Sequence, residues 1–118
     1  MRGRRLEYEV RGNSIASFRS MRRTTFDFSG QVAVVTGGAR GIGKGSAEAF
    51  AEAGARVYIV DLDEAGGEAV ARSIRERGGN ASFLACDVTD FARVRAVFDQ
   101  ILAEAGRLDI LVNSAGGF

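Results

Sequence analysis

Three of the four glycines in the segment from Thr36 to Gly43, which reads Thr-Gly-Gly-Ala-Arg-Gly-Ile-Gly, have a spacing that suits ligand binding. Gly37 permits a tight turn after a strand, Gly41 lets the backbone approach a bound pyrophosphate, and Gly43 lacks the Cβ that would keep a helix away from a sheet. A helix that begins here presents free N–H groups and a partial positive charge to phosphate oxygens. The segment therefore predicts a binding site for a dinucleotide.

Asp61 is the second candidate, eighteen residues after Gly43 and at the end of a predicted strand. A carboxylate at that place can accept hydrogen bonds from both ribose hydroxyls of an adenosine. A 2′-phosphate about 4 Å away would be repelled by roughly 4 kcal/mol per unit charge at an effective dielectric of about 20. Arg40 could attract that phosphate, but Leu62 offers no second basic group. The sequence thus predicts NAD rather than NADP.

Residue types that the chain lacks exclude other chemistry. There is no histidine, the carboxylates do not cluster at ligand spacing, and Cys86 is the only cysteine, so no metal site is predicted. A single cysteine cannot form an internal disulfide, which favours a reducing, cytoplasmic compartment, and Cys86 is expected to be a small core residue. No apolar run approaches the roughly 20 residues of a membrane span. The 46% hydrophobic and 26% charged residues are typical of one ordinary globular domain.

Charge divides the chain into two parts. Residues 1–28 carry seven arginines and three acidic residues, a net charge of +4, and the remainder carries −3, which argues against a nucleic-acid surface on the body of the protein. Residues 1–27 show no useful periodicity and are expected to be a disordered leader, or upstream sequence translated from an early start, with Met21 as a natural start. Glu7 and Glu9 disfavour a targeting peptide. Residues 28–118 are then the folded domain.

From residue 30 onward, strand and helix patterns alternate. Strands are predicted at 31–36, 56–61, 82–86 and 108–113, and helices at 42–53, at 64–77 and from the capping residues Thr89 and Asp90 to about residue 105. Connections this short between buried strands require parallel pairing and helical crossovers, so the fold class is a doubly wound α/β sheet. The residues expected to face the core are, for the three helices in turn, Ile42, Ala49, Phe50 and Ala53; Ala65, Ala69, Val70 and Ile74; and Val94, Val97, Ile101 and Leu102.

Further motifs lie in register with the glycine segment. The segment itself matches Thr-Gly-x-x-x-Gly-x-Gly, Cys86-Asp87-Val88 resembles an adenine-contacting Asp-Val pair, and residues 109–116 resemble a strand that ends in Asn-Asn-Ala-Gly. Over residues 28–117 the chain therefore resembles the classical short-chain dehydrogenase/reductase family. The resemblance implies a Rossmann-type fold, here truncated after its fourth strand.

The resemblance also implies roles for individual residues. It assigns the pyrophosphate to the glycine segment, the adenosine ribose and adenine to the ends of the second and third strands, and the nicotinamide ribose to the end of the fourth. Ser114 departs from the family, which often has a second Asn there. The residues assigned to the cofactor are Gly37, Arg40, Gly41, Ile42, Gly43, Asp61, Leu62, Asp87, Val88, Asn113, Ala115 and Gly116.

Catalytic residues are absent from the chain. The family uses a Ser and a Tyr-x-x-x-Lys pair, whereas the only lysine here is Lys44 and the only tyrosines are Tyr8 and Tyr58. We therefore expect the NAD-binding half of an oxidoreductase that transfers hydride between nicotinamide and an alcohol or carbonyl substrate, inactive alone and a homo-oligomer when complete. One alternative is a stand-alone nucleotide-binding module without catalysis. Another is a methyltransferase, which Thr36 and the glycine spacing disfavour.

Overall fold

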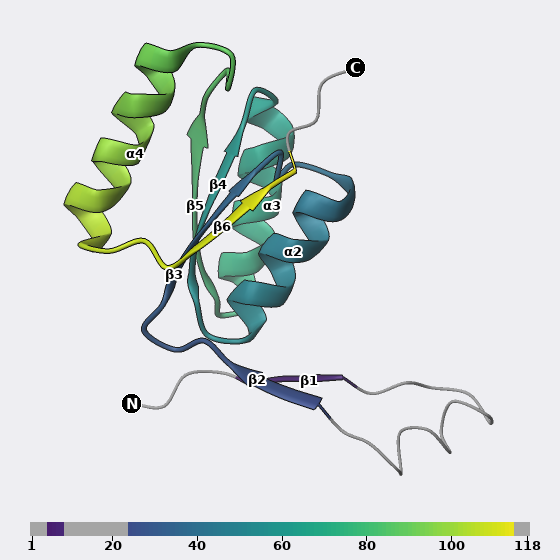
Figure 1. Cartoon of the computed structure of the whole chain (residues 1–118). Helices are drawn as coiled ribbons and strands as arrows, with labels where there is room; N and C mark the ends of the chain where they lie inside the picture. The colour runs from purple at the N-terminus through teal and green to yellow at the C-terminus, as the bar shows by residue number, and fades with distance from the viewer. Residues whose placement is uncertain (1–4, 9–23, 115–118) are drawn as a thin grey trace.

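The computed structural model describes residues 5–8 and 24–114. Its centre is a parallel sheet of four strands, with helix α4 on one face and helices α2 and α3 on the other (Figure 1). The strands are β3 (Val32–Thr36), β4 (Arg56–Asp61), β5 (Asn80–Ala85) and β6 (Ile110–Asn113), and the helices are α2 (Gly41–Glu52), α3 (Glu64–Glu76) and α4 (Phe91–Ala105). The predicted α/β class and doubly wound parallel sheet are confirmed.

The strand order, β5-β4-β3-β6, places the first strand of the sheet in its interior. The chain moves outward from β3 through β4 to β5, then crosses back over α4 so that β6 pairs with the other side of β3. The strand order therefore reverses between β3 and β6. A crevice at this reversal is the usual ligand site of open α/β sheets.

Local signals explain where the helices begin and end. The Asp63 carboxylate accepts a hydrogen bond from the Gly66 amide at the start of α3, and the Asp90 carboxylate accepts one from the Arg93 amide at the start of α4. Gly106, with φ of 77°, ends α4 in a left-handed conformation that costs a glycine little. These elements lie within two residues of the predicted bounds.

The core has two parts, one on each face of the sheet. The β3 and β4 side chains on one face pack against α2 and α3, and those on the other face, with Tyr58 among them, pack against Val97 and Ile101 of α4. The predicted inward faces were wrong at four positions: Ile42 is 82% exposed, Leu102 is 47% exposed, and Ala65 and Ala69 are also exposed. Small residues explain the error in α2. This helix approaches the sheet through Gly43, Ala47 and Ala51, and that close approach turns Ile42 outward.

Two further strands, β1 (Arg5–Tyr8) and β2 (Thr24–Asp27), pair antiparallel beside the main sheet (Figure 1). No strand was predicted here, because four residues are too few to establish an alternating pattern. Phe28, directly after β2, packs edge-to-face with Phe50, their ring centroids 5.3 Å apart, and donates its amide proton to the Ala53 carbonyl at 2.8 Å. The chain leaving β2 is thereby attached to the end of α2. None of the helices in the described residues could cross a membrane.

Candidate cofactor cleft

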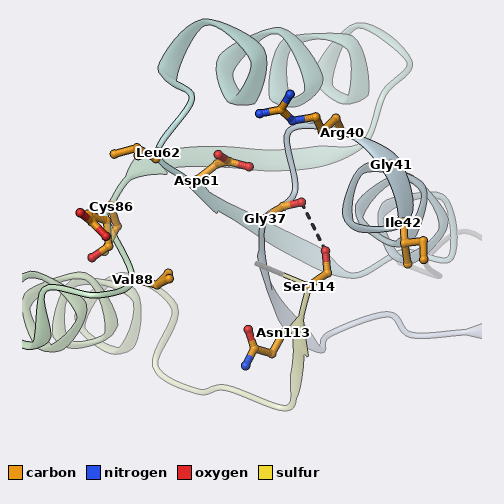
Figure 2. A pocket seen from close by; sticks show the side chains of 11 residues that line it. Gly37, Arg40, Gly41, Ile42, Asp61, Leu62, Cys86, Val88, Asn113 and Ser114 are labelled. Carbon is orange, nitrogen blue, oxygen red and sulfur yellow. Dashed lines mark hydrogen bonds between the residues drawn. The ribbon is translucent and has the colours of Figure 1, made fainter. Parts of the chain in front are cut away.

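A cleft of about 700 Å³ opens at the carboxyl ends of the four parallel strands (Figure 2). Its volume is in the range of small-molecule and cofactor sites. It lies at the reversal of strand order, between β3 and β6. The residues that line it are Gly37, Arg40, Gly41, Ile42, Asp61, Leu62, Cys86, Asp87, Val88, Asn113 and Ser114.

The glycine turn forms one wall of the cleft. Gly37 and Gly41 have φ of 71° and 60°, the left-handed region that side chains disfavour. Gly43 is buried behind them, where an added Cβ would overlap the carbonyl oxygen of Gly37 and the hydroxyl of Ser114. Arg40, the N-cap of α2, makes no side-chain cap hydrogen bond, so the first amides of the helix are left for another acceptor. This wall fits the pyrophosphate of a dinucleotide.

Asp61 is held at the end of β4 by two backbone amides. One carboxylate oxygen accepts a hydrogen bond from Ala39 at 3.0 Å, and the other accepts one from Asp63 at 2.9 Å. Each oxygen has a second lone pair available for a ribose hydroxyl. The Arg40 side chain extends toward the same side of the cleft (Figure 2). Among the described residues the Arg40 guanidinium has no ion-pair partner.

The loop after β5 supplies the apolar part of this end of the cleft. Val88 is 39% exposed and Leu62, after β4, is 70% exposed, which leaves both side chains accessible to a planar ring. Beside them the Asp87 carboxylate accepts hydrogen bonds from the Thr89 hydroxyl at 2.7 Å and the Thr89 amide at 2.9 Å, and these bonds lower the pKa of Asp87. Cys86 is buried, and this burial raises the pKa of its thiol, as expected for a core cysteine rather than a reactive one.

The end of β6 forms the opposite side of the cleft. The buried hydroxyl of Thr36 donates to the side-chain oxygen of Asn113 at 2.8 Å, which ties β6 to β3 at the base of the glycine turn. The Ser114 hydroxyl lies 3.4 Å from the Gly37 carbonyl oxygen (Figure 2). Ser114 thus brings a donor to the glycine turn at the position where the family often has Asn.

Tyr58 lies away from the cleft, as predicted from its place within a strand. It is fully buried beneath α4, and its hydroxyl donates to Glu104 at 3.1 Å. Burial, followed by the Glu104 hydrogen bond, raises the pKa of Tyr58. The side chain cannot exchange a proton with a ligand in the cleft.

The cleft brings together most of the residues predicted from sequence. Gly43 lies behind the wall and shapes it, and Ala115 and Gly116 lie outside the described residues. Sequence reasoning did not assign Cys86 and Ser114 to the site, although both line the cleft, nor did it assign Thr36 the role of orienting Asn113. In the part of the chain that is described, His, Cys, Asp and Glu form no group able to hold a metal ion.

Comparison with known proteins extends the resemblance. The family model for short chain dehydrogenases matches residues 31–118. D-threitol dehydrogenase of Mycolicibacterium smegmatis is 53% identical over 94 residues, which are 77% of this chain and 36% of that protein. L-fucose dehydrogenase of Oryctolagus cuniculus is 48% identical over 89 residues, 75% of this chain and 30% of that protein.

A solved structure shares the fold as well. The crystal structure of a metagenomic short-chain oxidoreductase in complex with NADP superimposes with a TM-score of 0.73 at 45% identity, covering 75% of this chain and 40% of that one. The chain spans about a third of the length of the two dehydrogenases that it matches.

Proposed function

The chain belongs to the short-chain dehydrogenase family, and from that premise we propose that it forms the dinucleotide-binding part of an oxidoreductase acting on an alcohol or carbonyl substrate. One observation carries the proposal: an uncapped helix N-terminus behind a glycine turn faces the same cleft as a carboxylate at the end of the next strand. The nicotinamide cofactor, when bound, accepts or gives the hydride.

In this proposal, different lining residues bind different parts of the cofactor. Gly37, Gly41 and the first amides of α2 bind the pyrophosphate, with Ile42 and Arg40 at the rim. Asp61 accepts hydrogen bonds from the adenosine ribose, and the adenine lies by the apolar surfaces of Leu62 and Val88, with Asp87 at its edge. Asn113, Ala115 and Gly116 run beside the nicotinamide ribose, and Gly43 keeps α2 close enough for the turn to form.

We propose NAD as the cofactor rather than NADP. Asp61 supports this choice, because its carboxylate is anchored by the amides of Ala39 and Asp63 and could not turn away from a 2′-phosphate without leaving both unpaired. Arg40 supports the alternative, since its guanidinium lacks an ion-pair partner among the described residues and could attract that phosphate. A related enzyme has been crystallised with NADP, so the choice depends on which of the two side chains prevails.

We further propose that residues 1–118 alone do not catalyse, since the chain contains no Tyr-x-x-x-Lys. The complete protein is proposed to be a cytoplasmic homo-oligomer. Residues 1–27 are proposed to be a leader, or upstream sequence translated from an early start, outside the NAD-binding domain, although residues 5–8 and 24–27 form β1 and β2 where disorder was expected.

The cofactor proposal is tested by measuring the affinity of the full-length protein for NAD⁺ and NADP⁺ by calorimetry. We expect tighter binding of NAD⁺, and weakening by about 1–3 kcal/mol in Asp61→Ala, the cost of losing hydrogen bonds to a charged group. Asp99→Ala is the matched control, because it removes the same charge from the exposed surface of α4. Tenfold or better selectivity for NADP⁺ would make the choice of NAD wrong, and failure of both dinucleotides to bind would refute the proposed function.

A further inference from the structure

The peptide between Ala85 and Cys86 occupies a special place at the end of β5. Its N–H, from Cys86, donates to the Asp61 carbonyl at 3.1 Å and so joins β5 to β4 beside the ribose carboxylate. The carbonyl of the same peptide points the opposite way, because the two groups of a trans peptide are antiparallel. In the described sheet β5 is an edge strand, so no strand lies on that side to pair with the Ala85 carbonyl.

Arg93 supplies the missing donors. Its Nε and Nη2 both lie within hydrogen-bond distance of the Ala85 carbonyl oxygen, at 3.2 and 2.9 Å. A planar guanidinium can direct two N–H groups at one oxygen, whereas an ammonium group cannot present that fork. The Ala85–Cys86 peptide is thus bonded on both sides, to Asp61 on one and to Arg93 on the other.

The loop between β5 and α4 carries Asp87 and Val88, the residues proposed to lie beside the adenine. Within it, the Asp90 amide donates a hydrogen bond to the Asp87 carbonyl at 3.0 Å. The Asp90 carboxylate accepts a hydrogen bond from the Arg93 amide at 3.1 Å. The Arg93 side chain then closes the loop by reaching back to the last residue of β5. Asp87 and Val88 therefore project from a loop whose two ends are joined by one side chain.

We infer that Arg93 is a positioning residue for the adenosine end of the cofactor, an inference that rests on the proposed function. Arg93 does not line the cleft. It acts through the Ala85–Cys86 peptide, which keeps Asp87 and Val88 at a fixed separation from Asp61 and Leu62. Removing the Arg93 side chain should weaken binding of the adenosine end of the cofactor. Binding of the nicotinamide end, which depends on β6, should not change.

The test measures two ligands that divide the dinucleotide, ADP-ribose and nicotinamide mononucleotide, by calorimetry on the full-length protein. Arg93→Ala should bind ADP-ribose about three- to tenfold more weakly, the equivalent of one modest hydrogen bond, with nicotinamide mononucleotide unchanged. Arg93→Lys, which keeps the charge and one donor, should recover part of the affinity. Arg95→Ala is the matched control, because Arg95 is exposed on the same helix and its side chain makes no hydrogen bond with other described residues.

Three results would overturn the inference. Unchanged ADP-ribose affinity in Arg93→Ala would show that the bonds to Ala85 do not position the site. An equal loss in Arg95→Ala would assign the effect to long-range attraction between basic groups and phosphate, and an equal loss for both ligands would assign it to general destabilisation. If Arg93→Ala does not fold, Arg93→Gln replaces it, and wild-type ADP-ribose affinity there overturns the inference as well. Failure of the wild-type protein to bind ADP-ribose is a separate outcome that refutes the proposed function itself.

Discussion

The two edge strands of the parallel sheet, β5 and β6, differ in how their outward groups are bonded and covered. At the β5 edge, the outward carbonyl of Ala85 is bonded to Arg93, and the side chains of residues 82–85 are half-buried. At the β6 edge, Leu111 is 55% exposed and Asn113 is also exposed, although both lie on a strand that pairs with the most buried strand of the sheet. Both edges border the same cleft, so the strands at its two ends differ in how far side chains cover and bond them.

This difference separates the two halves of the proposed cofactor site. The adenosine end is built from β4, β5 and their loops, where hydrogen bonds from backbone and side chains fix Asp61 and Asp87. The nicotinamide end depends on Asn113, the last residue of an edge strand on which the Leu111 side chain remains exposed in the described structure. We expect changes at the β6 edge to affect mainly folding, and changes at the β5 edge to affect mainly cofactor affinity.

The largest expected effect concerns residues 1–118 expressed alone. An uncovered apolar edge strand pairs readily with other chains, and a few hundred Å² of apolar surface left wet, at about 25 cal/mol per Å², is large beside a typical net stability of roughly 5–15 kcal/mol. We predict an aggregating or molten product without dehydrogenase activity, measured by light scattering and thermal unfolding. Leu111→Lys should slow the aggregation more than Phe91→Lys, a control that is 88% exposed on a helix. A monodisperse monomer with a sharp thermal transition would contradict the prediction and favour a stand-alone binding module.

A smaller effect is expected at the glycine turn, which both halves of the site share. Gly43→Ala places a methyl group against the Gly37 carbonyl and the Ser114 hydroxyl, so the turn must shift, at a typical overpacking cost of about 1–3 kcal/mol. We predict at least about a tenfold loss of NAD⁺ affinity, together with a lower melting temperature.

Gly45→Ala is the matched control for that variant. A Cβ at Gly45 would meet no atom within 4 Å, and replacing glycine with alanine inside a helix stabilises by roughly 0.5–1 kcal/mol. The control should therefore raise the melting temperature and keep NAD⁺ affinity. Equal behaviour of the two variants would show that close approach of α2 is not what the turn requires.

The smallest expected effect is a pH dependence at the β5 edge. Hydrogen bonds from the Thr89 hydroxyl and amide hold the pKa of Asp87 below its ordinary value, so the stability that Asp87 contributes is present above that value and is lost as the pH falls through the lowered pKa. Thr89→Val should raise the pKa of Asp87 toward its ordinary value, measured by NMR titration of the carboxyl group. The stability gap between wild type and Asp87→Asn should close as the solution is acidified. A gap that widens in acid would contradict the assignment.

Much of the fold could be predicted because its signals are local. The short β-branched strands, the capping residues Asp63 and Asp90 and the terminating glycines are read within one element, and the structure has them within two residues of the expected places. The inward face of α2 could not be read this way. Large apolar residues usually mark the buried face, whereas here Gly43, Ala47 and Ala51 are buried because they let the helix approach the sheet, and Ile42 is left exposed.

The remaining features depend on contacts between distant residues. β1 and β2 are four residues each and depend on pairing across a long connection. Outside the cleft lining, Arg93 belongs by sequence to the polar surface of a helix, and only the fold brings its guanidinium to the end of β5. Thr36 and Asn113 lie far apart in sequence, and their hydrogen bond requires β6 to pair with β3. Motif spacing could propose the cleft residues but not these supports.

The two amides that hold Asp61 have a consequence for how a nucleotide would enter. A flexible aspartate would lose rotational freedom on binding a ribose, at about 0.5–1.5 kcal/mol for an immobilised side chain. Asp61 has already lost that freedom, since Ala39 and Asp63 fix both carboxylate oxygens without any ligand. The Ala39 bond also attaches the glycine turn to β4. The ribose of a nucleotide would therefore bind to a carboxylate that is already oriented. The phosphates of the same nucleotide would bind to a glycine turn that is already formed.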